Sequence, residues 1–168
     1  MTPSARRSFA LAFSLFFVAC FQYAFANAMQ IRGAQPDLLM TFTIVGAMFC
    51  DMGGGAATGF FAGLFHASFA SPPGGGFGAL IVSRTLVGAG VGWMEDRVFR
   101  DQPLFTALCV AVGTLISEAI FFVAAPQPQT LHWAKMALLS ALYNAVIALP
   151  MAAVLRRLTG QSSRLDDL

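Results

Sequence analysis

The stretch Leu104–Ala124 reads LFTALCVAVGTLISEAIFFVA and carries one charged side chain, Glu118. A transmembrane α-helix needs about 20 mostly apolar residues to cross the roughly 30 Å hydrocarbon core of a bilayer. This stretch has both that length and that composition. We therefore predict that it crosses a membrane as a helix, with Glu118 inside the apolar layer.

Apolar runs of similar character occupy most of the chain on both sides of this stretch. They are Ser8–Ala28, Asp37–Cys50, Gly54–Ala70, Phe77–Met94 and Lys135–Leu155. Short segments rich in Gly and Pro separate most of them, as expected for loops. The pattern predicts about six crossings. The second run is short for a crossing. It forms either a tight helical hairpin with the third run or a re-entrant pair with it.

The composition of the whole chain points to the same class. Of 168 residues, 57% are hydrophobic and 11% are charged, whereas soluble domains have about 45–50% and about 25%. We predict an all-α, polytopic integral membrane protein that folds as a compact bundle. Residues 1–158 form one transmembrane domain and residues 159–168 a short polar tail. The net charge of +2 gives no reason to expect nucleic acid.

The first run also has features of a cleavable signal. Arg6 and Arg7 precede it, and Ala24-Phe25-Ala26 resembles a signal-peptidase site. A signal core spans about 7–15 residues, whereas Ser8–Ala28 is long enough to cross a bilayer. We therefore expect a retained first helix.

The basic residues near the ends of the runs predict the orientation. An even number of crossings places on one side Arg6, Arg7, Arg97, Arg100, Arg156, Arg157 and Arg164. The other side then holds Arg32 and Lys135. Because basic residues accumulate on the cytoplasmic side, we expect both termini in the cytoplasm. The loop that contains Arg97 and Arg100 is the candidate for a cytoplasmic contact.

Two charges lie well inside apolar runs, Arg84 and Glu118. An isolated charge at the centre of a bilayer costs at least ~2.5–3.5 kcal/mol, so such residues usually pair. The two residues lie at similar depth on neighbouring antiparallel helices. We predict an Arg84–Glu118 ion pair, which either fixes packing or forms a proton or substrate site.

Small residues recur every four positions on three of the predicted helices. The stripes contain Gly88 and Gly92, then Gly55, Gly59 and Gly63, then Ser140, Asn144 and Ala148. Small residues let helix backbones approach closely, and Asn side chains bond across helices. The stripes predict helix-packing faces, and those near Gly59 and Ala148 are candidate faces for a partner.

The sequence shows no catalytic constellation. A GxSxG, an HExxH and a phosphate-binding loop with its Lys are all absent. His66 has no His or Cys close to it in sequence, and Asp37 stands where a carboxylate suits the start of a helix. We therefore expect no enzyme activity, no cofactor and no metal site.

The order of several short motifs resembles the rod shape-determining MreD family. The motifs are Gln35-Pro36-Asp37-Leu38-Leu39, Gly59-Phe60-Phe61-Ala62-Gly63-Leu64, Phe77-Gly78-Ala79-Leu80, Val98-Phe99-Arg100-Asp101 and Ser140-Ala141-Leu142-Tyr143-Asn144-Ala145. The resemblance covers about Ser8 to Leu158. It departs from the family at His66 and Ala67, where members often carry an Asp, and at Arg84.

The resemblance implies a non-enzymatic component of the bacterial inner membrane that acts in cell elongation. Such proteins bind MreC, a single-span protein, and link MreB filaments to the peptidoglycan synthases RodA and penicillin-binding protein 2. The alternative is the substrate-binding membrane subunit of an energy-coupling-factor importer, which is also a small six-helix protein. A pocket open to the outside favours the importer.

Overall fold

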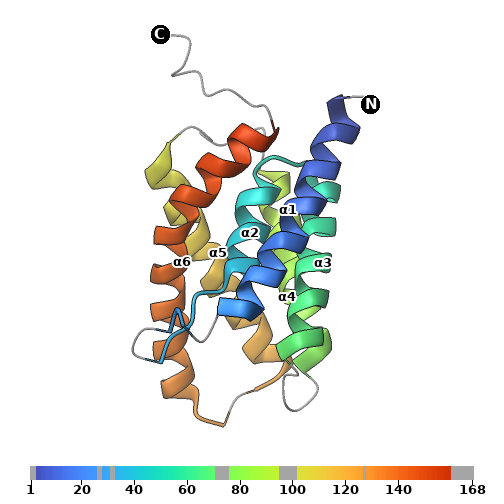
Figure 1. The fold of residues 1–168 in the computed structure, drawn as a ribbon. Helices are drawn as coiled ribbons and strands as arrows, with labels where there is room; N and C mark the ends of the chain where they lie inside the picture. Colours follow the sequence, from blue (N-terminus) through green and yellow to red (C-terminus); the bar gives the residue numbers. More distant parts are fainter. Residues whose placement is uncertain are drawn as a thin grey trace.

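The computed structural model describes residues 3–25, 28–30, 33–70, 76–94, 102–126 and 128–159. These residues fold into six α-helices (Figure 1). The helices are α1 (Pro3–Phe25), α2 (Leu38–Ala47), α3 (Met52–Ala70), α4 (Gly76–Trp93), α5 (Pro103–Ala124) and α6 (Thr130–Thr159). The predicted all-α class and the presence of six helices are confirmed for these residues, whereas six membrane crossings stay a prediction.

Four of the helices are long and apolar enough to cross a membrane. They are α1 over Ser8–Phe25, α4, α5 and α6. Each has fewer than half of its residues buried inside the protein, and large apolar side chains on each of them are exposed at the outside of the bundle. An apolar exterior is what a lipid solvent requires, and it agrees with the predicted class of membrane protein.

The short helix α2 forms the centre of the bundle. It has 10 residues, all of them buried, and contacts each of the other five helices. At 1.5 Å per residue it is about 15 Å long, roughly half of a bilayer core. A helix that is apolar on every side is expected at such a buried position. The predicted second span therefore contains a half-length central helix.

Helices α3 and α4 pack unusually closely through glycine. A Cβ atom placed on Gly55 would collide with the carbonyl of Gly88, and one on Gly59 would collide with the carbonyl of Arg84. At Gly63 the added atom would lie 2.7 Å from the Cα of Ile81. Only glycine permits this approach, which is why the two helices meet along these stripes.

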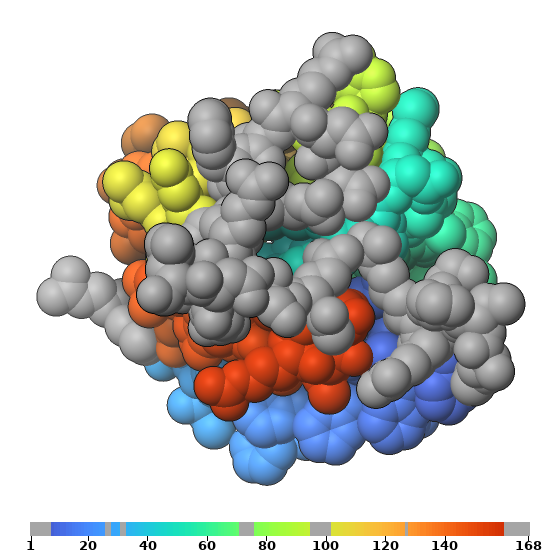
Figure 2. All heavy atoms as spheres, turned by 90° about the horizontal axis from the view of Figure 1, so that it is seen from above, coloured from blue at the N-terminus to red at the C-terminus, as the bar shows by residue number. Residues whose placement is uncertain are grey.

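The amino end of α1 and the carboxyl end of α6 lie at the same end of the bundle (Figure 1). The view onto this end shows α1 and α6 beside each other at one edge (Figure 2). Helix α2 begins at mid-height in the bundle and runs toward this end (Figure 1). Its amino terminus is therefore held inside the protein, where the polar residues described next converge.

Candidate functional site: a polar centre at the start of α2

Asp37 caps the amino terminus of α2. Its Oδ1 accepts a hydrogen bond from the backbone N–H of Met40 at 2.8 Å. Its own backbone N–H donates to Oδ1 of Asn144 on α6 at 2.9 Å. A carboxylate at this position satisfies an otherwise free N–H group and suits the positive end of the helix dipole.

Arg84 of α4 forms an ion pair with Asp37. Nη2 contacts Oδ2, and Nη1 donates to Oδ1 at 3.4 Å. The side chain of Arg84 is 3% exposed and that of Asp37 14%. Removing two charges from water is expensive, so a buried pair needs good geometry and additional hydrogen bonds. The two contacts from the guanidinium group supply the geometry, and the bond from the N–H of Met40 supplies an additional hydrogen bond.

The predicted ion pair of Arg84 with Glu118 is wrong, because Arg84 pairs with Asp37 in the structure. Among the described residues, Glu118 instead accepts a hydrogen bond at Oε2 from the indole N–H of Trp133, at 3.2 Å. Two charged residues must lie at similar depth to form an ion pair. Similar depth does not determine whether Arg84 pairs with Asp37 or with Glu118. Because α2 begins in the middle of the bundle, it brings Asp37 into reach of Arg84.

His66 of α3 also lies beside the Asp37 carboxylate, near the same oxygen that Arg84 contacts. Its Nδ1 is 3.6 Å from Oδ2 of Asp37, which is too long for a hydrogen bond. This nitrogen is buried and has no hydrogen-bond partner. The hydroxyl of Tyr23 on α1 donates to the carbonyls of Phe65 and His66, both at 3.3 Å. These bonds tie α1 to α3 next to the pair.

Polar side chains from three helices secure the segment around Asp37. Gln22 of α1 donates to the carbonyl of Pro36 at 3.0 Å and accepts from the N–H of Leu38 at 2.7 Å. The amide of Asn144 donates to Oγ1 of Thr114 on α5 at 3.3 Å. Buried polar groups are costly unless they are bonded. The network therefore holds the start of α2 in one position.

A pocket of about 530 Å³ lies beside this network. Its wall includes Tyr23, Asp37, His66, Glu118, Trp133 and Ser140. Phe69 and Ala70 at the end of α3 also line it, as do residues from the first turns of α6. The pocket is therefore at the end of the bundle opposite to the start of α1.

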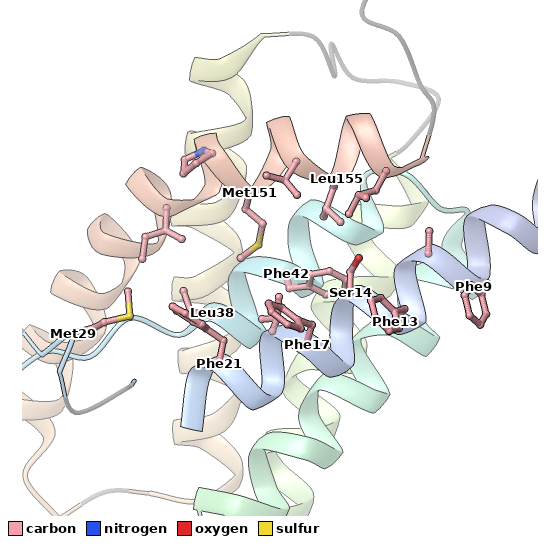
Figure 3. A pocket seen from close by; sticks show the side chains of 16 residues that line it. Phe9, Phe13, Ser14, Phe17, Phe21, Met29, Leu38, Phe42, Met151 and Leu155 are labelled. Atoms are coloured by element: carbon pink, nitrogen blue, oxygen red, sulfur yellow. The ribbon is translucent and has the colours of Figure 1, made fainter. Parts of the chain in front are cut away.

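A larger hollow of about 870 Å³ lies on the side of the bundle between α1 and α6 (Figure 3). Four phenylalanines spaced four residues apart on α1 line it, and α6 contributes Met151 and Leu155. Leu38 and Phe42 of α2 also line it. Ser14 is the one polar side chain among the described residues that line it, and these residues include no acid, base or metal ligand.

The structure places the other predicted residues as follows. The stripe with Gly55, Gly59 and Gly63 is covered by α4, so it packs within the protein and is not free for a partner. Ser140 donates to the carbonyl of Gln35 at 3.4 Å, and Asn144 and Ala148 are buried. Arg97 and Arg100 lie outside the described residues. Within the described ranges, no three acidic, His or Cys residues group as metal ligands.

Sequence reasoning did not find the roles of Gln22, Tyr23 and Trp133. Each belongs to a common residue type near the end of an apolar helix, where Tyr and Trp are frequent for other reasons. Asp37 carried a usable signal, because an acidic residue that directly precedes a buried helix is a typical cap. The signal indicates that Asp37 caps a helix, but not that Arg84 is its ion-pair partner.

The fold and the site define a helical protein of membrane character with a buried polar centre and an adjoining pocket. Comparison of the chain with protein-family models, with curated proteins and with solved structures gives no match.

Proposed function

We propose that this chain is a non-enzymatic scaffold of the bacterial inner membrane that acts in cell elongation, as MreD proteins do. In this proposal all six helices lie in the bilayer and both termini are cytoplasmic. The protein binds the membrane helix of an MreC-like partner, in a complex with MreB, RodA and penicillin-binding protein 2. The loop with Arg97 and Arg100 provides the cytoplasmic contact.

The groove between α1 and α6 is the observation that carries this proposal. In lipid, exposed apolar side chains are normal, so the apolar lining alone indicates nothing about a partner. The shape is informative, because helices associate in membranes through close van der Waals packing. A hollow of about 870 Å³ flanked by two long helices offers such packing to a third.

Two alanines two positions apart on α1 provide a matched test. Ala10 lines the groove, whereas Ala12 is exposed on α1 and does not line it. We expect Ala10→Trp to fill the groove and to reduce recovery of an MreC-like protein at least about tenfold, which corresponds to ~1.4 kcal/mol. Ala12→Trp should leave recovery unchanged. The measurement is affinity purification of tagged protein from its native membrane, read by mass spectrometry.

Equal recovery with both variants would contradict the proposed binding face. Recovery of no elongation protein with the unmodified chain would contradict the proposed function itself. Both variants should first be shown to reach the membrane in the same amount, because a folding defect also lowers recovery.

The pocket of about 530 Å³ favours a second candidate, the substrate-binding membrane subunit of an energy-coupling-factor importer. Such a subunit requires a polar and aromatic pocket that opens away from the cytoplasm. The same purification separates the two candidates, since this one predicts recovery of paired ATPases with a membrane coupling subunit.

A further inference from the structure

Among the described residues that line the pocket, Glu118 is a carboxylate that forms no salt bridge. Asp37 has Arg84 as its partner. Glu118 contacts the neutral indole of Trp133, and in the described part of the chain it forms no salt bridge. Counting the carboxylates and guanidinium group of the described residues, Glu118 beside the Asp37–Arg84 pair leaves a surplus of one negative charge. Charged residues at such depth usually mark sites for ions or ligands.

Aromatic side chains surround the same space. Trp133 lines the pocket and is stacked on Phe122 with ring centroids 4.5 Å apart. Tyr23 and Phe69 also line it, and their ring centroids are 4.5 Å apart. The faces of aromatic rings attract cations, most strongly when water is excluded. A carboxylate together with aromatic rings is a typical combination for recognising an organic cation.

We propose that this pocket binds a small primary ammonium ion with an apolar body. The ammonium group donates to the carboxylate of Glu118, and the apolar body packs against Trp133 and Tyr23. The size is suitable, because ligand pockets enclose about 300–1,000 Å³. An anion is disfavoured, since the carboxylates of Glu118 and Asp37 both line the wall.

His66 adds a position for a second polar contact. Its Nδ1 is buried without a hydrogen-bond partner, 3.6 Å from Oδ2 of Asp37, and the residue lines the pocket. Buried polar atoms without partners are rare in native proteins. Because Nδ1 is closed off, a ligand in the pocket contacts instead the exposed part of this imidazole, whose side chain is 22% exposed. The inference rests on the pocket alone and goes beyond the scaffold function, so the two can fail separately.

The test uses phenethylamine, which is protonated at pH 7, and the neutral 2-phenylethanol. Binding to the purified full chain in an uncharged maltoside detergent is measured by equilibrium dialysis. We expect saturable binding of the amine and at least about tenfold weaker binding of the alcohol, as expected for a hydrogen bond between charged groups. Equal binding of the two, or no saturable binding of the amine, would overturn the proposal.

Two acid-to-amide substitutions supply the matched controls. Glu118→Gln keeps the shape of the side chain and should weaken amine binding at least about tenfold. Asp51→Asn changes an exposed carboxylate outside the pocket and should leave binding unchanged. If both variants bind as the unmodified protein does, Glu118 is not the site. The comparison of amine with alcohol remains decisive if Glu118→Gln does not fold.

A primary ammonium group also occurs in the headgroup of phosphatidylethanolamine. Repeating the measurement with this lipid added to the detergent identifies the source of the natural ligand. Displacement of phenethylamine by phosphatidylethanolamine, but not by phosphatidylglycerol, assigns the pocket to the lipid headgroup. If phenethylamine stays bound in the presence of phosphatidylethanolamine, the pocket is assigned to a soluble amine.

Discussion

At the scale of single residues, the ion pair between Asp37 and Arg84 determines the centre of the protein. Asp37 interacts with α4 through its carboxylate and with α6 through its backbone, while it caps α2. Removing one member of a buried pair leaves an uncompensated charge, which typically costs 3–5 kcal/mol. Removing both members together costs much less.

We therefore predict strong coupling between these two residues. Arg84→Gln should lower the free energy of unfolding by about 3 kcal/mol. Adding Asp37→Asn to it should recover at least about 1 kcal/mol. Adding Glu118→Gln should recover less than Asp37→Asn does, because Arg84 pairs with Asp37 and the hydrogen bond of Glu118 goes to Trp133, so Glu118 acts on Asp37 only through longer-range repulsion. Unfolding in detergent with increasing denaturant measures all four proteins, and a larger rescue by Glu118→Gln than by Asp37→Asn would contradict the assignment.

The sequence predicts that Arg84 is buried and paired, but not with which residue. Position along a helix fixes how deep a side chain lies, while the partner depends on how the helices are rotated and placed. The relevant carboxylate comes from α2, whose start at mid-height is visible only in the assembled fold (Figure 1). For this reason depth alone points to Glu118, although the partner in the fold is Asp37.

At the scale of elements, the packing of α3 against α4 depends on glycines that have no space for a side chain. Gly59 faces the backbone of Arg84, so its place in the stripe also positions the ion pair. Gly90 lies on the same helix as Arg84, but an added Cβ atom there meets nothing within 4 Å. The two glycines form a natural comparison.

Gly59→Ala should destabilise the protein by at least about 2 kcal/mol, because its Cβ would collide with backbone that cannot move alone. Gly90→Ala should be neutral or stabilising by up to about 1 kcal/mol, since alanine favours helix more than glycine does. Thermal unfolding followed by tryptophan fluorescence distinguishes them. A similar loss of stability from both substitutions would contradict the claim that the close contact between the backbones of α3 and α4 excludes a side chain at Gly59.

The sequence indicates these stripes because residues four positions apart lie on one face of a helix, and small residues on that face let another helix approach closely. It does not indicate which element covers each stripe. The same limit applies to α2, where an apolar run of intermediate length is consistent with a short crossing, a re-entrant helix or a buried core helix. Burial on all sides decides among these, and burial is a property of the assembled bundle.

At the scale of the whole molecule, the protein has two hollows of different character in different places. A polar pocket lies at one end, next to the first turns of α6, and an apolar groove runs along the side between α1 and α6. Composition and run lengths predict the class of protein and its number of helices. The groove depends on how far α1 stands from α6, which no local sequence pattern encodes.

Site-specific photocrosslinking in living cells tests the central claim most directly. A photoreactive phenylalanine analogue replaces Phe13, which lines the groove, or Phe61, which is 51% exposed on α3 and does not. The proposal predicts that position 13 crosslinks to a single-span MreC-like protein and that position 61 does not. Crosslinking of that protein at position 61 alone, or of no protein at either position, would contradict it.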